Sequence, residues 1–107
     1  MNKSISETRK FLINRLGYLR NKANLSAREL SLTLGYSPAY IAKFENGDFS
    51  IPAEVLLEAI EICKSTPNEF FYNKLEDYEK DKELIDIIST LSTDSKQTLI
   101  ELAKKLK

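Results

Sequence analysis

The chain has 107 residues, 42% of them hydrophobic and 30% charged, with a formal net charge of zero. This length favours one compact domain, with or without an appended segment. No apolar run approaches the ~18 residues of a membrane span, and the N-terminus lacks the apolar region of a signal peptide. A single cysteine, Cys63, permits no internal disulfide. These features exclude a membrane protein and a disulfide scaffold, and we expect a cytoplasmic protein.

The zero net charge hides an asymmetry along the chain. Residues 1–43 carry eight Lys or Arg and two acids, which gives +6, and residues 44–107 carry −6. A split of this kind indicates a front that faces an anion and an acidic back.

The first helix is expected over residues 5–22. Its apolar side chains recur at helical spacing and form one stripe of Leu12, Leu16, Leu19 and Ala23. The Lys and Arg residues of this segment fall mostly off the stripe, either as a solvated face or as a surface for a partner.

A capping box of Ser26 and Glu29 starts the second helix, in which Leu30 and Leu34 face inward. Gly35 ends this helix, because glycine adopts the left-handed conformation of a helix C-terminus at little cost.

The third helix is expected over residues 37–46, with Ser37 as its N-cap and Pro38 at its first position. Ile41 and Phe44 face inward, and Gly47 closes the helix.

Two further helices complete the first part of the chain. One opens at 50–52 and carries the stripe Leu56, Ala59, Ile60 and Cys63. Cys63 is interpreted as a small core residue, since the sequence has no His to activate a thiol. A second capping box, Thr66 to Glu69, begins a short fifth helix that buries Phe70 and Phe71.

Residues 73–83 are highly charged with little apolar periodicity, and are interpreted as a linker. Residues 84–107 contain two apolar stripes, with a cap at Ser92–Asp94 between them, which predicts an antiparallel helical hairpin. The stripes are Leu84, Ile87, Ile88 and Leu91, then Leu99, Leu102, Ala103 and Leu106. This hairpin either forms a dimer surface or packs onto the fourth and fifth helices of its own chain.

Two helices joined by a three-residue turn that contains Gly form a helix-turn-helix pattern. The spacing within Leu25–Gly47 resembles the DNA-binding domain of the phage repressor and Cro type, the xenobiotic-response-element class of regulators. The matching residues are Leu16, Leu19, Arg20, Leu25, Ser26, Leu30, Ser31, Leu34, Gly35, Ser37, Tyr40, Ile41, Phe44, Glu45, Asn46 and Gly47. The likeness covers residues 10–72 and implies an all-α fold: a five-helix DNA-binding domain over 1–72, followed by the linker and hairpin.

The resemblance also implies roles for individual residues. The third helix would read the DNA major groove. The base-facing positions are Pro38, Ala39, Tyr40 and Lys43. Phosphate contacts are expected at Ser26, Ala27, Arg28, Ser37, Asn46 and Gly47, together with backbone N–H groups at the starts of the second and third helices. Arg20 and Glu45 match a structural salt bridge between the first and third helices.

The sequence departs from the family at the reading surface. Ala27 stands where relatives usually place Gln, and Pro38–Ala39 gives an apolar tip where they often place a polar reader. Asp48 adds an acid just past the third helix. Lys43 is the one strong base donor, so a half-site is expected to give weak or shape-based specificity.

The predicted function is a sequence-specific transcriptional regulator, a repressor, that binds double-stranded DNA as a homodimer. Its half-sites would lie one turn apart, about 34 Å. The alternative is a protein-binding helix-turn-helix module, such as an antitoxin or the partner of a regulator. Catalysis is not expected, because the chain has no His and no Gly-rich phosphate loop. No metal or cofactor is expected, since His and a second Cys are absent.

Overall fold

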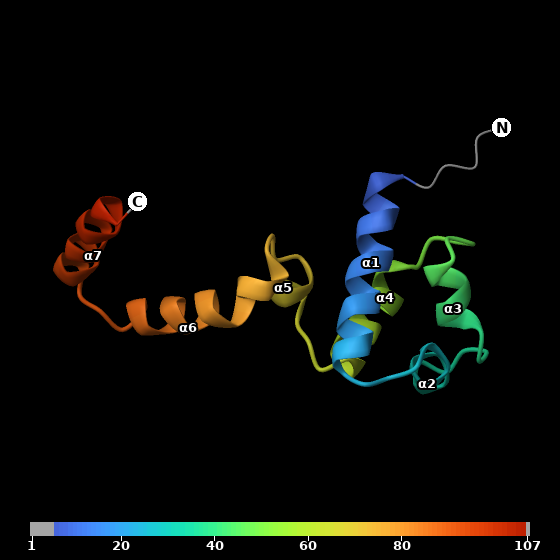
Figure 1. The fold of residues 1–107 in the computed structure, drawn as a ribbon. Coiled ribbons are helices and arrows are strands. Elements are labelled where there is room, and N and C mark those ends of the chain that lie inside the picture. The colour runs from blue at the N-terminus through green and yellow to red at the C-terminus, as the bar shows by residue number, and fades with distance from the viewer. Residues whose placement is uncertain (1–5, 107) are drawn as a thin grey trace. The chain divides into compact units, whose positions relative to one another are not determined.

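The computed structural model describes residues 6–106, in which the regular secondary structure is helical and no strand is present (Figure 1). The predicted all-α fold is therefore confirmed. The chain forms two compact units that divide between Tyr72 and Asn73. We call them the N-terminal unit and the C-terminal unit.

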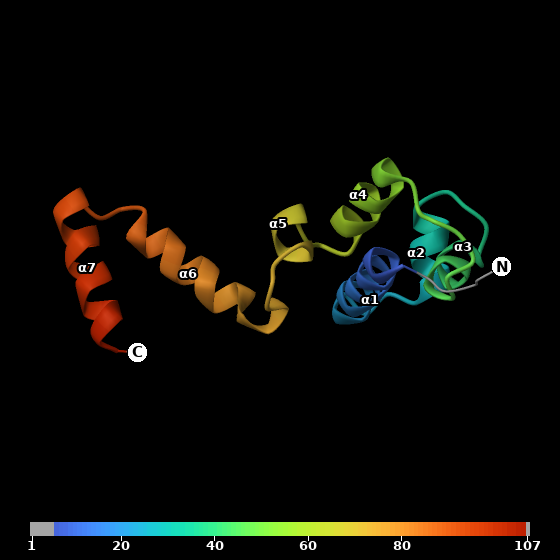
Figure 2. The same ribbon diagram turned by 90° about the horizontal axis from the view of Figure 1, so that it is seen from above.

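Residues 6–72, the described part of the N-terminal unit, form five helices. They are α1 (Glu7–Lys22), α2 (Ala27–Thr33), α3 (Tyr40–Glu45), α4 (Ala53–Ile62) and α5 (Pro67–Phe70). Helix α1 contacts α3, α4 and α5, and α2 contacts α3 and α4. Figure 2 shows α2 and α3 beside each other on one side of this unit.

The core of the N-terminal unit draws on every one of these helices. Its buried apolar residues are Leu16, Leu19, Leu30, Ile41, Phe44, Val55, Leu56, Ala59, Ile60, Cys63 and Phe70. The stripe predicted for the fourth helix is buried throughout, while Leu12 and Leu34 are half-buried. Burial raises the pKa of the Cys63 thiol to about 11, which disfavours the nucleophilic thiolate.

Two expectations for the first and fifth helices are corrected. Ser6 is the N-cap of α1 and accepts from the Arg9 N–H, so the helix begins at Glu7; residue 5 lies outside the described residues. Phe70 is buried but Phe71 is 56% exposed. The reason is that consecutive side chains on a helix point about 100° apart, so a one-turn helix sends only one of them into the core.

The second predicted capping box is half formed. The Thr66 hydroxyl accepts from the Glu69 N–H at 3.2 Å, as predicted. The Glu69 carboxylate instead accepts from Ser65 Oγ at 2.6 Å and from Lys22 Nζ at 3.0 Å. Glu69 therefore links α5 to α1 rather than returning to its own N-cap.

The C-terminal unit contains a 3-10 turn (Leu75–Asp77), α6 (Tyr78–Ile88) and α7 (Thr93–Lys105). Most of the segment interpreted as a linker is thus helical. Glu, Lys and Leu are good helix formers, and pairs such as Lys82–Asp86, 3.5 Å apart, support a helix without any apolar periodicity.

The two predicted C-terminal helices are present, and Ser92 caps α7 by accepting from the Ser95 N–H. Their apolar stripes do not close on each other. In Figures 1 and 2 the helices diverge from the connection between them, and Leu84, Ile87, Leu99 and Leu102 remain exposed.

Candidate DNA-binding site

The second helix of the motif begins as the sequence predicts. Ser26 Oγ accepts from the Glu29 N–H at 2.9 Å, and Glu29 Oε1 accepts from the Ser26 N–H at 2.8 Å. The Ser26 backbone and side-chain hydrogen bonds lower the pKa of Glu29, so its carboxylate stays ionised. Two of the predicted phosphate contacts lie in this first turn. The N–H of Ser26 already donates to Glu29, whereas the side chain of Arg28 is exposed.

Both glycines of the motif have a left-handed backbone. Gly35 has φ 88° and Gly47 has φ 85°, and each follows the last turn of a helix. The Tyr36 N–H bonds to Ser31 O, and the Asp48 N–H bonds to Lys43 O, which closes α2 and α3 in the same way. Any L side chain at these two positions would be strained.

The start of the third helix differs from the prediction. Ser37, Pro38 and Ala39 form a turn, and α3 begins at Tyr40 with no side-chain cap from Ser37. The Tyr40 N–H bonds to the carbonyl of Ser37, and the Ile41 N–H bonds to Ser31 Oγ at 2.9 Å. The expectation that backbone N–H groups at this helix start hold a phosphate is thus wrong for Tyr40 and Ile41, because both already have partners.

Ser31 connects the two helices of the motif by hydrogen bonds. Its side chain is fully buried, donates to Ala27 O at 2.7 Å and accepts from the Ile41 N–H. Helix α2 therefore supplies the cap of α3, and this buried hydroxyl ties the start of α3 to α2. The sequence marked Ser31 as a small matching residue but not as a cap, since the bond joins residues ten apart.

An ion pair fixes α3 against α1. Arg20 Nε donates to Glu45 Oε2 at 2.9 Å, and a second nitrogen donates to Oε1 at 3.1 Å. The third donor of Arg20 reaches Leu25 O at 2.8 Å, at the start of α2. The guanidinium group thus holds all three helices, and its side chain is only 13% exposed.

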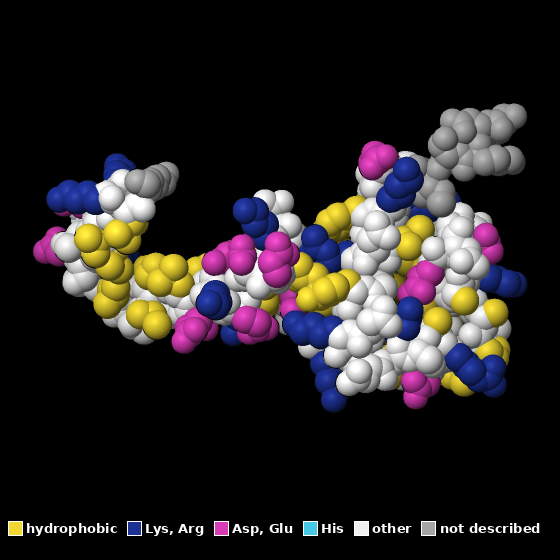
Figure 3. Space-filling model, viewed as in Figure 1, with side chains coloured by type: hydrophobic (Ala, Val, Ile, Leu, Met, Phe, Trp, Pro, Cys, Tyr) yellow, Lys and Arg dark blue, Asp and Glu magenta, His cyan; other side chains and the backbone are white. Residues whose placement is uncertain are grey.

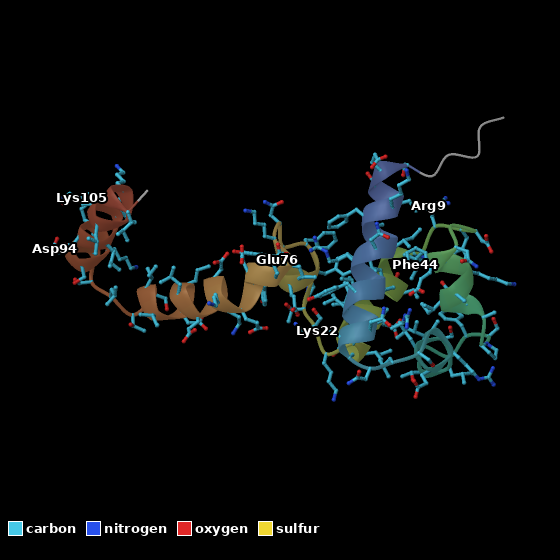
Figure 4. All side chains as sticks on the ribbon, in the orientation of Figure 1. Arg9, Lys22, Phe44, Glu76, Asp94 and Lys105 are labelled. Atoms are coloured by element: carbon cyan, nitrogen blue, oxygen red, sulfur yellow. The ribbon has the colours of Figure 1, made fainter. Side chains whose placement is uncertain are left out.

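Arg9 anchors the turn after α3 and was missed by the sequence reasoning. It donates to Gly47 O at 2.9 Å and to Ser50 Oγ at 2.8 Å, from the first turns of α1 (Figure 4). The Gly47 N–H bonds to Phe44 O, so the backbone of Gly47 is engaged on both sides. In this turn, the side chain of Asn46 is exposed and its amide can donate hydrogen bonds.

The predicted base-facing residues lie together on one exposed surface. Pro38, Ala39 and Lys43 are exposed, and Tyr40 is half-buried. Tyr40 stacks on Tyr36, with ring centroids 4.2 Å apart, and packs against Phe49 at 4.9 Å. Burial, and then the neighbouring Tyr36, raise the pKa of Tyr40, so its hydroxyl remains a neutral donor.

Tyr36 and Phe49 were not among the predicted site residues. The spacing of Tyr36 and Tyr40, four residues apart, is the signal that would have paired them. Their rings pack on Tyr40 and reduce its freedom.

The comparisons with known proteins identify the family. The helix-turn-helix family model of the Cro/C1 type matches residues 16–70. The chain belongs to this family of DNA-binding regulators. The search of the curated proteins and the search of the solved structures found no match.

Family membership supports DNA binding by a helix-turn-helix regulator domain, and the family is one of DNA-binding regulators. Among the described residues, no helix combines the length and apolarity that crossing a membrane requires. Within residues 6–106, no cluster of three or more His, Cys, Asp or Glu side chains is arranged to hold a metal ion.

Proposed function

We propose that the chain is a sequence-specific transcriptional repressor that binds operator DNA as a homodimer, with the surface of α3 in the major groove. The observation that carries the proposal is the rigid mounting of this surface. Ser31 fixes the start of α3 at Ile41, Arg20 fixes its last residue, Glu45, and Arg9 fixes the turn after it at Gly47. Lys43 remains exposed. A groove-reading helix needs this combination of fixed backbone and free polar side chains.

Direct readout would come from few groups. Lys43 suits the acceptors of guanine, Tyr40 offers a neutral hydroxyl, and Pro38 with Ala39 suits a thymine methyl. Arg28, Ser37 and the side chain of Asn46 would contact phosphates, and Ser26, Ala27 and Gly47 would shape the backbone that approaches them. One half-site therefore gives modest specificity, and two half-sites about 34 Å apart supply the rest.

A band-shift assay tests the proposal, using the DNA upstream of the chain's own gene and sites selected from genomic fragments. Binding should weaken as salt rises, with a log–log slope of about −0.9 for each phosphate neutralised. No shift at micromolar protein, or a flat salt dependence, would contradict DNA binding. A protein that binds an operator in this way acts at the nucleoid.

The variant Lys43→Ala tests whether Lys43 contacts bases or only the DNA backbone. We expect it to relax base preference at one position of each half-site, at a cost of about 1–3 kcal/mol on the preferred sequence. The matched control is Arg28→Ala, which should weaken all sequences alike and reduce the salt slope by about one. If Lys43→Ala leaves the preferred sequence unchanged, Lys43 does not read bases.

A second candidate is binding to a protein surface through the same helices, as an antitoxin or the partner of a regulator. The stacked Tyr36–Tyr40 rings, the apolar Pro38–Ala39 tip and the exposed Leu32 favour this function. A stable complex with the product of an adjacent gene, which Tyr36→Ala disrupts, would support it.

A further inference from the structure

A column of aromatic rings runs from the core of the N-terminal unit to the surface at the start of α3. The fully buried Phe44 packs against Phe49, with ring centroids 6.0 Å apart, and Phe49 packs against Tyr40 at 4.9 Å. Tyr40 stacks on Tyr36 at 4.2 Å, with the two ring planes only 13° apart. Tyr36 ends the column at the surface, where it is 42% exposed. In Figure 3, hydrophobic side chains reach the surface over α2 and α3.

The two residues of the outer stack both leave a fixed backbone. The Tyr36 N–H donates to Ser31 O at 3.0 Å. The Tyr40 N–H donates to Ser37 O at the same distance. A tyrosine side chain turns about only two bonds, and stacked rings are a favoured geometry. The ring of Tyr36 therefore restricts the directions in which the Tyr40 hydroxyl can point.

The direction of this hydroxyl decides which base it can pair with. A neutral phenol hydroxyl both donates and accepts, so a mobile one adapts to donors and acceptors alike on different base edges. A fixed hydroxyl pairs only with the group that stands opposite. The ammonium group of Lys43 only donates, so it selects acceptors even when it is mobile. Among the base-facing residues, Tyr40 is thus the one whose selectivity depends on being held in place.

We propose that Tyr36 is a positioning residue for DNA recognition, which holds the ring of Tyr40 so that its hydroxyl selects one base pair of the half-site. Tyr36 acts through Tyr40 and not through a DNA contact of its own. The inference rests on the proposed function for the placement of α3 in the major groove. It adds to that function a residue outside the base-facing set that determines base preference.

Substitutions at Tyr36 in the full-length chain separate the roles of its ring and its hydroxyl. Tyr36→Phe keeps the ring, whereas Tyr36→Leu and Tyr36→Met replace it with aliphatic side chains of different shape. Band shifts on operators substituted one base pair at a time first identify the position whose preference Tyr40→Phe removes. At that position we expect both aliphatic variants to lower discrimination about fivefold, the contribution of one hydrogen bond, and Tyr36→Phe to retain it.

A double-mutant cycle tests whether Tyr36 acts through Tyr40. In the Tyr40→Phe background, Tyr36→Leu should have no further effect on base preference, whereas in the Lys43→Ala background its full effect should persist. Affinity for non-specific DNA should not change, because the phosphate contacts are unaltered. Leu57→Ala, at an exposed position of α4, is the control for loss of apolar surface and should leave base preference unchanged. Urea denaturation confirms that each variant is folded at the assay temperature.

Four results would overturn the inference. Tyr40→Phe removes no base preference, or the aliphatic Tyr36 variants discriminate as well as the wild type. Tyr36→Leu has an equal effect in the Tyr40→Phe background or an equal counterpart in Tyr36→Phe, which would mean that Tyr36 contacts DNA itself. The aliphatic variants weaken all sequences alike, which would assign Tyr36 a structural role only. Failure of the proposed function is distinct from these results, since the wild-type chain would then shift no DNA.

Discussion

Glu69 is the carboxylate that ties the stability of the N-terminal unit to pH. Burial alone would raise its pKa, but the hydrogen bonds from Ser65 and Lys22, with the charge of Lys22, lower it overall. The ionised form therefore stabilises the fold. This contribution is complete above the ordinary value of 4.5 and is lost as the pH falls through the lower pKa of the folded protein.

Glu69→Gln should cost about 1 kcal/mol at pH 7, since half-exposed Lys22 is screened by solvent. The variant should also flatten the fall in the free energy of unfolding below pH 5. Urea denaturation between pH 3 and pH 7 measures both effects. Glu58→Gln, at an exposed position of α4, is the control and should leave the curve unchanged. An equally steep acid transition in Glu69→Gln would refute this role. The acid dependence that comes from Glu29 should survive in both variants.

At the scale of single residues, the sequence predicts best what is local. The Ser26–Glu29 capping box and the left-handed Gly35 follow from residues within four positions of each other. Arg9, whose partners lie 38 and 41 residues away, carries no local signal. The charge pattern singled out the cations of α1 but left open whether they face solvent or a partner. In the structure, Arg9, Arg15 and Arg20 each donate hydrogen bonds to other residues of the same chain.

At the scale of elements, α2 and α3 act as one piece because Ser31 joins them. The sequence placed both helices but began the third too early, since Ser37 and Pro38 form a good local start signal. The tertiary cap from Ser31 prevailed over that signal, and the helix starts where the buried hydroxyl meets the Ile41 N–H.

Ser31→Ala should destabilise the N-terminal unit by about 1–3 kcal/mol, because it leaves the buried Ile41 N–H without an acceptor. DNA affinity should fall by more than stability alone explains, since the orientation of α3 is no longer fixed. Urea denaturation and band shifts at a temperature where the variant is folded measure the two effects. The matched control is Thr33→Ala, which removes an exposed hydroxyl that donates to Glu29 O within the same helix. If both variants lose stability and DNA affinity equally, the Ser31 hydroxyl does not fix α3 on α2.

Side chains of α1 fasten the end of α5 to the N-terminal unit. Arg15 donates to the carbonyls of Phe70 and Tyr72, both at 2.7 Å, and lies 4.7 Å from the ring of Phe11. Phe11 in turn stacks on the exposed Phe71 at 6.2 Å. The last helix of the N-terminal unit is thus fastened to α1 up to Tyr72, where the C-terminal unit follows.

At the scale of the whole molecule, the two units differ in how they are stabilised. The N-terminal unit has a buried core with Phe44, Phe70 and Leu16 fully enclosed, whereas the described residues of the C-terminal unit contain no buried side chain. The sequence predicted the apolar stripes of α6 and α7 but not their cover, because a stripe has the same pattern whether it packs within one chain or between two.

This difference predicts a concentration dependence confined to one part of the chain. If a second copy covers α6 and α7, their folding is linked to association, and dilution below the dimer dissociation constant releases both helices. Amide exchange in residues 78–105 should accelerate on dilution, whereas exchange in α1 to α5 should stay constant because the N-terminal core is complete in one chain. Hydrogen exchange with mass spectrometry at two concentrations, about a hundredfold apart, measures both regions in one sample. Ile87→Asp, which places a charge on the exposed stripe, should make the exchange of α6 and α7 fast at both concentrations without altering α1 to α5. Constant protection of 78–105 across the dilution would mean that the chain stabilises these helices by itself.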